Sequence, residues 1–278
     1  MSGSAGGPPA WVWQRGTVER DSETIYWELV STGEGDDRPA VVLSHGAGGS
    51  HAAWYQQVPA LASRFRVVTW DSRGFGNSTN RADAPSAPAA ADDLAAVLDH
   101  LGVDRAHLVS QSMGGWHISA FALGHPGRVL SLTYGDTVGG LWTAELRQAM
   151  KEFQAAGGLG TPGETTTVGG HRALWSGSAQ RDLAHAFLYQ QLGSFFSPPM
   201  HRLGDTIGWT VSHDAIAALA VPVLFIAGTH DQIFPARLLE GSAALIPGAR
   251  FVEIPDAGHS PYFEQPAAWN DALLSFLP

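Results

Sequence analysis

The chain has 278 residues, a formal net charge of −10 and no cysteine. Its length suits either one large α/β domain or a domain plus a modest insertion. The missing cysteines exclude disulfides, a thiolate nucleophile and cysteine-ligated zinc. The acidic charge, with no two of the 16 lysines and arginines adjacent, argues against nucleic-acid binding, and no run of 18 apolar residues predicts a membrane span. We therefore expect a cytoplasmic protein without nucleic-acid or membrane partners, and the sequence leaves its oligomeric state open.

The first part of the chain alternates strand-like and helical segments. Residues 1–10 are small and lack a basic or apolar stretch, which predicts a flexible leader and not a signal peptide. Apolar runs bounded by turn residues then predict strands over residues 11–20, 23–30, 40–45, 66–71, 106–110 and 129–136. Helices are predicted over residues 91–102, where leucines and a valine recur at three- and four-residue steps, and over residues 114–126.

This rhythm stops after Val138 and resumes near the C-terminus. Residues 139–212 contain glycine clusters, amphipathic pieces and many aromatic residues. Further on, the sequence predicts strands over 221–231 and 249–255 and helices over 236–248 and 265–277. Strands that alternate with helices imply a mostly parallel sheet covered on both faces. We therefore expect one α/β core domain made of residues 11–138 and 213–278, with residues 139–212 inserted as a lid over the carboxyl edge of the sheet.

Three loops at the carboxyl ends of predicted strands carry Ser112, Asp231 and His259, in that order. Ligands bind at this edge of open α/β sheets. A serine hydroxyl needs a base to take its proton before it becomes a useful nucleophile, and histidine is the usual base near neutral pH. A carboxylate beside the histidine fixes its tautomer and stabilises the imidazolium. The three residues are therefore predicted to form a catalytic triad.

Five motifs make the sequence resemble the α/β-hydrolase superfamily from about residue 20 to the C-terminus: HGAGGS, DSRGFGNS, SQSMGG, GTHDQIFP and AGHSPYFEQP. The order Ser, Asp, His is also the one expected on α/β-hydrolase sheets. The resemblance implies the α/β-hydrolase fold, with helices on both faces of a mostly parallel sheet and a helical lid inserted after the sixth strand. It points to the serine branch, which includes carboxylesterases, enol-lactone hydrolases and carbon–carbon bond hydrolases; haloalkane dehalogenases and epoxide hydrolases carry aspartate at the nucleophile position.

The stretch LVSQSMGGW holds two serines, and only one fits a nucleophile turn. Small residues are needed two positions before and after the nucleophile, because strand and helix pass close together there. Counting from Ser112 gives Ser110 and Gly114, whereas counting from Ser110 gives Leu108, which is too large. Ser112 is therefore the predicted nucleophile, and Ser110 is a small substitute for the usual glycine.

The predicted chemistry also needs an oxyanion hole and a substrate pocket. We expect the backbone N–H groups of Met113 and Ala47 to stabilise the oxyanion. Gly48 is the second candidate for the donor from this loop and is assigned to substrate binding. Aromatic residues of the inserted segment should line an apolar pocket above Ser112, and we assign this role to Trp142, Trp175 and Phe187. No convergent set of ligands predicts a metal site.

Two other carboxylates need an interpretation. Asp136 follows the sixth predicted strand, where some superfamily members place the acid, and it is the rival of Asp231; alternatively it caps a turn at the start of the inserted segment. Asp71 and Arg73 are expected to form a structural pair in the loop after the fourth strand.

We therefore predict a cofactor-free serine hydrolase that cleaves a small or medium hydrophobic ester, lactone or thioester through an acyl-enzyme on Ser112. One alternative is a carbon–carbon bond hydrolase, or an enzyme resembling the cofactor-free dioxygenases, in which a His–Asp pair removes a substrate proton. Another alternative is a ligand-binding receptor that kept the triad, as hormone receptors of this superfamily do. The substrate itself cannot be derived from the fold.

Overall fold

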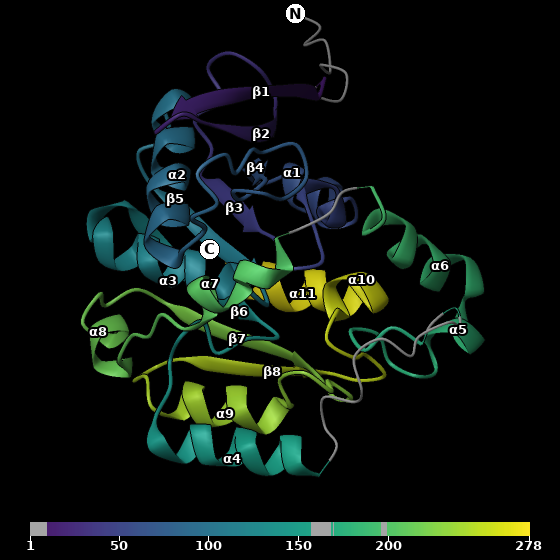
Figure 1. The fold of residues 1–278 in the computed structure, drawn as a ribbon. Coiled ribbons are helices and arrows are strands. Elements are labelled where there is room, and N and C mark those ends of the chain that lie inside the picture. Colours follow the sequence, from purple (N-terminus) through teal and green to yellow (C-terminus); the bar gives the residue numbers. More distant parts are fainter. Residues whose placement is uncertain (1–9, 157–167, 169, 196–198) are drawn as a thin grey trace, which may run out of the picture.

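The computed structural model describes residues 10–156, 168, 170–195 and 199–278, and its core is a single sheet (Figure 1). The strands are β1 (Val12–Arg20), β2 (Glu23–Ser31), β3 (Ala40–Ser44), β4 (Arg66–Trp70), β5 (Ala106–Gln111), β6 (Val129–Gly135), β7 (Val223–Gly228) and β8 (Arg250–Ile254). Their spatial order is β1-β2-β4-β3-β5-β6-β7-β8. The pairs β1–β2 and β2–β4 are antiparallel, and all other neighbours are parallel. The predicted leader lies, apart from Ala10, outside the described residues.

Helices cover both faces of the sheet, as the alternating pattern predicted. One apolar cluster packs under α2 (Ala87–His100), α3 (Gly114–Gly124), α8 (His213–Ala217) and α9 (Ala236–Ala244). The cluster on the opposite face involves the short helix η1 (His51–Trp54), α1 (Gln57–Ala62), α10 (Pro261–Glu264) and α11 (Pro266–Phe276). All residues of β3, β5 and β7 are buried. This burial on both faces matches the near-continuous apolar sequences of β3 and β7.

The segment between β6 and β7 forms several helices in its described part: α4 (Ala144–Ala155), α5 (Ser178–Arg181), α6 (Leu183–Leu192), η3 (Met200–Arg202) and α7 (Leu203–Ile207). The helix α4 packs along α9, and α6 contacts α10 (Figure 1). A further short helix, η2 (Pro126–Arg128), joins α3 to β6. No helix in the described ranges is both long and apolar enough to cross a membrane.

The register of the parallel strands brings their carboxyl ends to one edge. Ser44 at the end of β3 lies opposite Trp70 of β4 and Ser110 of β5, and Gln111 lies opposite Gly135 at the end of β6. The loops that follow these strands therefore start side by side. This edge collects the motifs that are far apart in the sequence.

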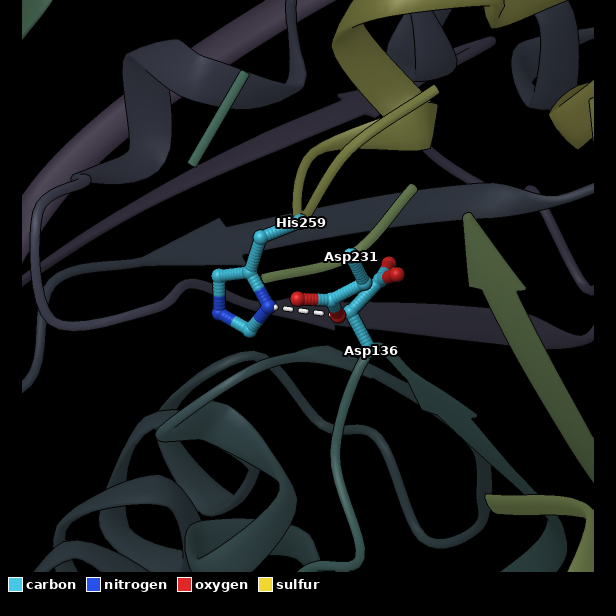
Figure 2. Close-up of side chains that lie close together, drawn as sticks. All are labelled: Asp136, Asp231 and His259. Atoms are coloured by element: carbon cyan, nitrogen blue, oxygen red, sulfur yellow. Dashed lines mark hydrogen bonds and ion pairs between the residues drawn. The ribbon is translucent and has the colours of Figure 1, made fainter. Parts of the chain in front are cut away.

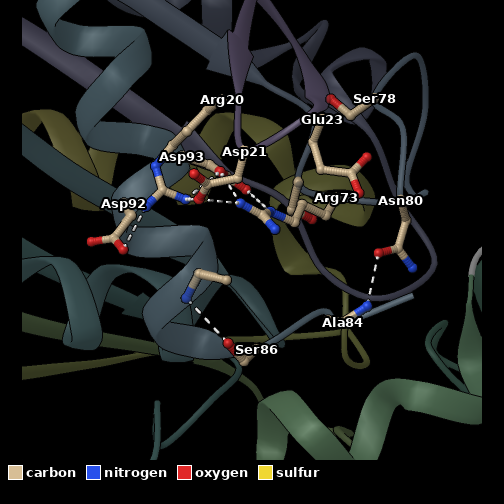
Figure 3. Close-up of polar contacts among 12 residues, drawn as sticks. Arg20, Asp21, Glu23, Arg73, Ser78, Asn80, Ala84, Ser86, Asp92 and Asp93 are labelled. Carbon is tan, nitrogen blue, oxygen red and sulfur yellow. Dashed lines mark hydrogen bonds and ion pairs between the residues drawn. The ribbon is translucent and has the colours of Figure 1, made fainter. Parts of the chain in front are cut away.

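The loop after β4 differs from the sequence prediction. Arg73 does not pair with Asp71; its guanidinium forms a two-pronged ion pair with Asp93 of α2, with Nη2 2.8 Å from Oδ1 (Figure 3). Asp71 instead accepts hydrogen bonds from the backbone N–H of His51 and from its ring Nδ1. The prediction of an Asp71–Arg73 pair is wrong because a fork-shaped guanidinium is best matched by both oxygens of one carboxylate, and α2 presents Asp93 in that geometry.

Candidate active site

Ser112 lies at the sharp turn between β5 and α3. Its φ of +48° is in the left-handed region, which residues other than glycine adopt at a cost. A Cβ atom at Gly114 would lie 2.2 Å from the carbonyl oxygen of Ser44, and one at Gly115 would lie 2.5 Å from Cγ2 of Thr137. Glycine is therefore required after the turn because the helix starts against the neighbouring strand, as the spacing argument expected.

Ser110 occupies a different environment. It is a fully buried residue of β5, and its hydroxyl donates a hydrogen bond of 3.0 Å to the carbonyl of Thr133 in β6. The hydroxyl is therefore engaged inside the sheet, whereas Ser112 lines a cavity. This contrast supports the choice of Ser112.

The loops after β5, β7 and β8 bring Ser112, Asp231 and His259 into one hydrogen-bonded chain. The Ser112 hydroxyl lies 2.8 Å from Nε2 of His259, and Nδ1 of the same ring lies 2.8 Å from Oδ2 of Asp231. Figure 2 shows the Asp231 carboxylate facing the imidazole. With its proton on Nδ1, His259 donates to Asp231 and keeps Nε2 free to accept from serine. These two hydrogen bonds have the geometry that a nucleophile, a base and an orienting acid would need.

Backbone donors hold Asp231 in position. Its Oδ1 accepts hydrogen bonds from the N–H groups of Ile233, at 2.7 Å, and Phe234, at 2.9 Å. The ring of Phe234 also stacks beside His259, with 5.9 Å between ring centroids. These contacts hold the Asp231 carboxyl group in place and restrict the plane of the imidazole.

Asp136 lies next to the hydrogen-bonded residues Asp231 and His259 and is completely buried (Figure 2). Its Oδ1 accepts a 2.9 Å hydrogen bond from the backbone N–H of Gly228 at the end of β7. It does not contact Nδ1 of His259 by any hydrogen bond found among the described residues, because Asp231 occupies that position. Asp136 therefore neither caps an exposed turn nor replaces Asp231 as the partner of the histidine.

The two amides predicted for the oxyanion hole line the same cavity as Ser112. Ala47 follows β3, and Met113 directly precedes α3. Within the described part of the chain, neither N–H donates a hydrogen bond to the protein. The loop after β3 is held by His45, whose Nε2 accepts from the backbone N–H of Ser72. Burial lowers the pKa of His45, which favours the neutral ring that this acceptor role needs.

The cavity above Ser112 has a volume of about 590 Å³, a typical size for a small-molecule site. Its lining combines loops of the core with the segment between β6 and β7. Apolar side chains dominate it: Met113, Trp116, Met150, Tyr189, Met200, Leu203, Ile207, Ile233, Phe234 and Tyr262. The polar residues Gln111, Gln154, His171 and Arg172 also line it.

The structure separates the four residues that were predicted to bind substrate. Gly48 lines the cavity, but Trp142, Trp175 and Phe187 are not among the described residues that do so. Trp142 packs beside Phe234 and Arg147, Trp175 stacks on His230 at 5.5 Å, and the Phe187 side chain is 49% exposed. The assignment of these three aromatics to the pocket is therefore wrong, because other side chains of the segment, such as Ile207, point into the cavity.

Two side chains make contacts near the site that the sequence did not predict. Nε2 of Gln111 donates a 2.8 Å hydrogen bond to the carbonyl of His259. Glu264 accepts from the backbone N–H groups of Trp175 and Gly258, each at 2.7 Å, so it joins the inserted segment to the loop of His259. Both residues lie inside the motifs SQSMGG and AGHSPYFEQP, but a motif does not reveal which backbone group a side chain will reach.

The fold and this arrangement of residues define an enzyme of the α/β-hydrolase class. The sequence model of the alpha/beta hydrolase family matches residues 41–272, and the chain belongs to this family. A relative from a Caulobacter species, named "Putative carbamate hydrolase RutD", is 32% identical over 95% of this chain and 98% of its own length. The 3-oxoadipate enol-lactonase 1 of Acinetobacter baylyi is 28% identical over 87% of this chain and 90% of its own.

Solved structures agree with this membership. A thermophilic esterase from Thermogutta terrifontis superposes with a TM-score of 0.75 and 28% identity, over 94% of this chain and 97% of the esterase. The family and these relatives together indicate that the chain is a hydrolytic enzyme.

Proposed function

We propose that this protein is a serine hydrolase that cleaves small or medium hydrophobic esters, lactones or thioesters through an acyl-enzyme on Ser112. The observation that carries the proposal is the chain Ser112–His259–Asp231, with 2.8 Å at each step, opening into an apolar cavity of about 590 Å³. An apolar lining favours hydrophobic substrates because it is dehydrated at little cost.

The reaction follows from the geometry. The Ser112 oxygen attacks the substrate carbonyl while Nε2 of His259 takes the hydroxyl proton, and Asp231 stabilises the resulting imidazolium. The backbone N–H groups of Ala47 and Met113 hold the negative oxygen of the tetrahedral intermediate. His259 then returns the proton to the leaving alkoxide, and the acyl group stays on Ser112.

Water completes the cycle. His259 removes a proton from a water molecule that attacks the acyl-enzyme, and the proton passes to Ser112 as the acid product leaves. No step uses a metal ion or an organic cofactor. The reactants of this scheme are a small-molecule hydrophobic substrate and water.

The relatives support ester-type chemistry and leave the bond to be determined. Their names include a carbamate hydrolase, an enol-lactonase and an esterase. The dioxygenase-like alternative would use the carboxylate after β6 as the partner of the histidine. In this structure Asp231 after β7 holds Nδ1, which favours hydrolysis.

A substrate panel tests the proposal. We expect turnover of aryl or alkyl esters of graded acyl length, with enol lactones, thioesters, carbamates and a ring-fission diketone as further arms and the Ser112→Ala variant as the blank. Turnover of the diketone alone would assign carbon–carbon cleavage. Binding of hydrophobic esters without turnover in any arm would contradict the proposal and point to a receptor.

A further inference from the structure

Asp136 has no function in the scheme above, although it lies at the centre of the site. It directly follows β6 with a φ of +51°, and its carboxyl group is fully buried. Its backbone N–H donates to the carbonyl of Ile226, and its Oδ1 accepts from the N–H of Gly228, so it joins the ends of β6 and β7. Ligand atoms of Asp136, Asp231 and His259 all lie within 4.8 Å of one another (Figure 2).

The two neighbouring carboxyl groups differ in their hydrogen-bond donors. Asp231 accepts from the N–H groups of Ile233 and Phe234 and from Nδ1 of His259. Asp136 accepts from Gly228 alone, and its Oδ2 has no donor among the described residues. Burying a charged carboxylate oxygen without a hydrogen-bond donor costs free energy. Placing negative charges on two adjacent carboxyl groups costs more, because the charges repel each other. The negative charge therefore belongs on Asp231 and the proton on Asp136.

We propose that Asp136 is a neutral carboxylic acid and a positioning residue, which donates the proton on Oδ2 to the Asp231 carboxylate behind His259. The added proton turns Oδ2 from an acceptor without a partner into a donor, and the Asp231 carboxylate is the acceptor beside it. Asp136 thereby acts on the reaction through Asp231 and does not touch the substrate. The kinetic consequences rest on the proposed function.

The electrostatic surroundings agree with a neutral Asp136. Burial raises the pKa of Asp136 well above its ordinary value, the charge of Asp231 and a side-chain hydrogen bond with it raise this pKa further, and only the Gly228 N–H opposes them. The other titratable groups that face the pair are His259, Glu264, Tyr189 and Tyr262. Among the described residues, no cation forms an ion pair with Asp136. A negative charge on Asp136 would therefore have no opposite charge beside it.

The proton on Asp136 also affects the base. A donor on Asp231 draws off part of its negative charge, and this weakens the stabilisation of protonated His259. Without that donor, the full charge of Asp231 would face His259 and attract a proton on its ring more strongly. Asp136 thus moderates the negative charge that the base faces.

Two substitutions separate this role from the alternatives. Asp136→Asn keeps an acceptor for Gly228, supplies an N–H donor to Asp231 and tolerates the left-handed backbone conformation. For this variant we expect kcat/KM within about threefold of wild type and an unchanged pH profile.

Asp136→Gly adopts the same backbone conformation without strain but removes the donor. For this variant we expect the acid limb of the kcat/KM profile to move up by about one pH unit, with about a tenfold loss of kcat/KM at lower pH. Asp21→Gly, at an exposed turn residue with a φ of +49°, is the matched control.

Infrared spectroscopy tests the protonation state without any substrate. The difference spectrum between wild type and Asp136→Asn at neutral pH should contain the carbonyl band of one protonated carboxyl group. Three results would overturn the proposal: no such band, an Asp136→Asn variant that is nearly inactive, or an Asp136→Gly variant with the wild-type pH profile. Loss of wild-type turnover in a chelator would also overturn it, because the three side chains would then hold a metal ion. If Asp136→Gly does not fold, the band and the Asn variant still decide, and the band decides even if none of the proposed substrates is turned over.

Discussion

The hydroxyl of Ser112 lies 2.8 Å from Nε2 of His259, although 147 residues separate the two in the chain. We expect Ser112→Ala to lose ester hydrolysis and labelling by a fluorophosphonate, with a fall of about 10⁶ in kcat, the size found when such a serine is removed. Ser110→Ala is the matched control: it removes only the bond to Thr133 and should cost about 1 kcal/mol of stability. Labelling that survives in Ser112→Ala but is lost in Ser110→Ala would assign the nucleophile to the other serine.

Asp231 should be the carboxylate on which the base depends. Its Oδ2 faces Nδ1 of His259, and an asparagine there favours the wrong tautomer, so Asp231→Asn should lower kcat by about 10⁴. Steady-state kinetics with the best ester of the panel measures this loss, and circular dichroism checks that the variant is folded. Near-wild-type activity in Asp231→Asn would exclude it as the orienting acid.

Gly114 should be irreplaceable for steric reasons. A Cβ atom would lie 2.2 Å from the carbonyl oxygen of Ser44, which is backbone and cannot rotate away. We expect Gly114→Ala to destabilise the fold by about 3 kcal/mol and to abolish labelling of Ser112. Gly124, at the other end of α3, has nothing within 4 Å of its Cβ position, so Gly124→Ala should leave stability unchanged or raise it by up to about 1 kcal/mol. Equal urea midpoints for both variants would contradict this contrast.

The cavity lining predicts which apolar residue of the inserted segment affects substrate binding. Ile207 and Phe187 are similarly exposed, at 40% and 49%, but only Ile207 lines the cavity. We expect Ile207→Ala to raise KM for a hydrophobic ester about three- to tenfold. Each buried CH₂ contributes about 0.8 kcal/mol, and the partly exposed side chain would bury only about one or two of the carbons that alanine lacks. Phe187→Ala should leave KM unchanged. A larger effect of Phe187→Ala would place the substrate on the outer face of α6.

The pair between His51 and Asp71 should make stability depend on pH. Burial lowers the pKa of His51, but the hydrogen bond and the charge of Asp71 outweigh it, so the pKa is raised above its ordinary value of 6.5. A raised histidine pKa means that the folded state holds the proton more tightly; the stabilisation is complete below about pH 6.5 and is lost as the pH rises through the folded-state value. The stability lost in His51→Gln should therefore be largest near pH 6 and shrink towards pH 9.

Urea unfolding at several pH values measures this difference. His201→Gln serves as the control. His201 also faces a carboxylate, at 3.6 Å from Asp83, but its side chain is 68% exposed, so this pair should contribute little to stability. A difference between wild type and His51→Gln that grows with rising pH would contradict the sign of the expected effect.

Local pattern in the sequence determined the fold and the location of the candidate site. Apolar runs such as residues 221–231, broken by turn residues, predicted the parallel sheet, and the carboxyl ends of strands are adjacent in any such sheet. This rule alone placed Ser112, Asp231 and His259 at one edge. The spacing around Ser112 distinguished it from Ser110. The requirement for small residues two positions before and after the nucleophile is local, so it can be read without the fold.

Only the tertiary structure decided which side chains meet across elements. The sequence could not show that Arg73 pairs with Asp93, that Ile207 and not Phe187 lines the cavity, or that Glu264 reaches the backbone of Trp175. These contacts depend on the relative position of helices packed against the sheet, which no local period encodes. Asp136 is the clearest case: its position after a strand was visible in the sequence, but its buried place beside Asp231 follows from the pairing of β6 with β7.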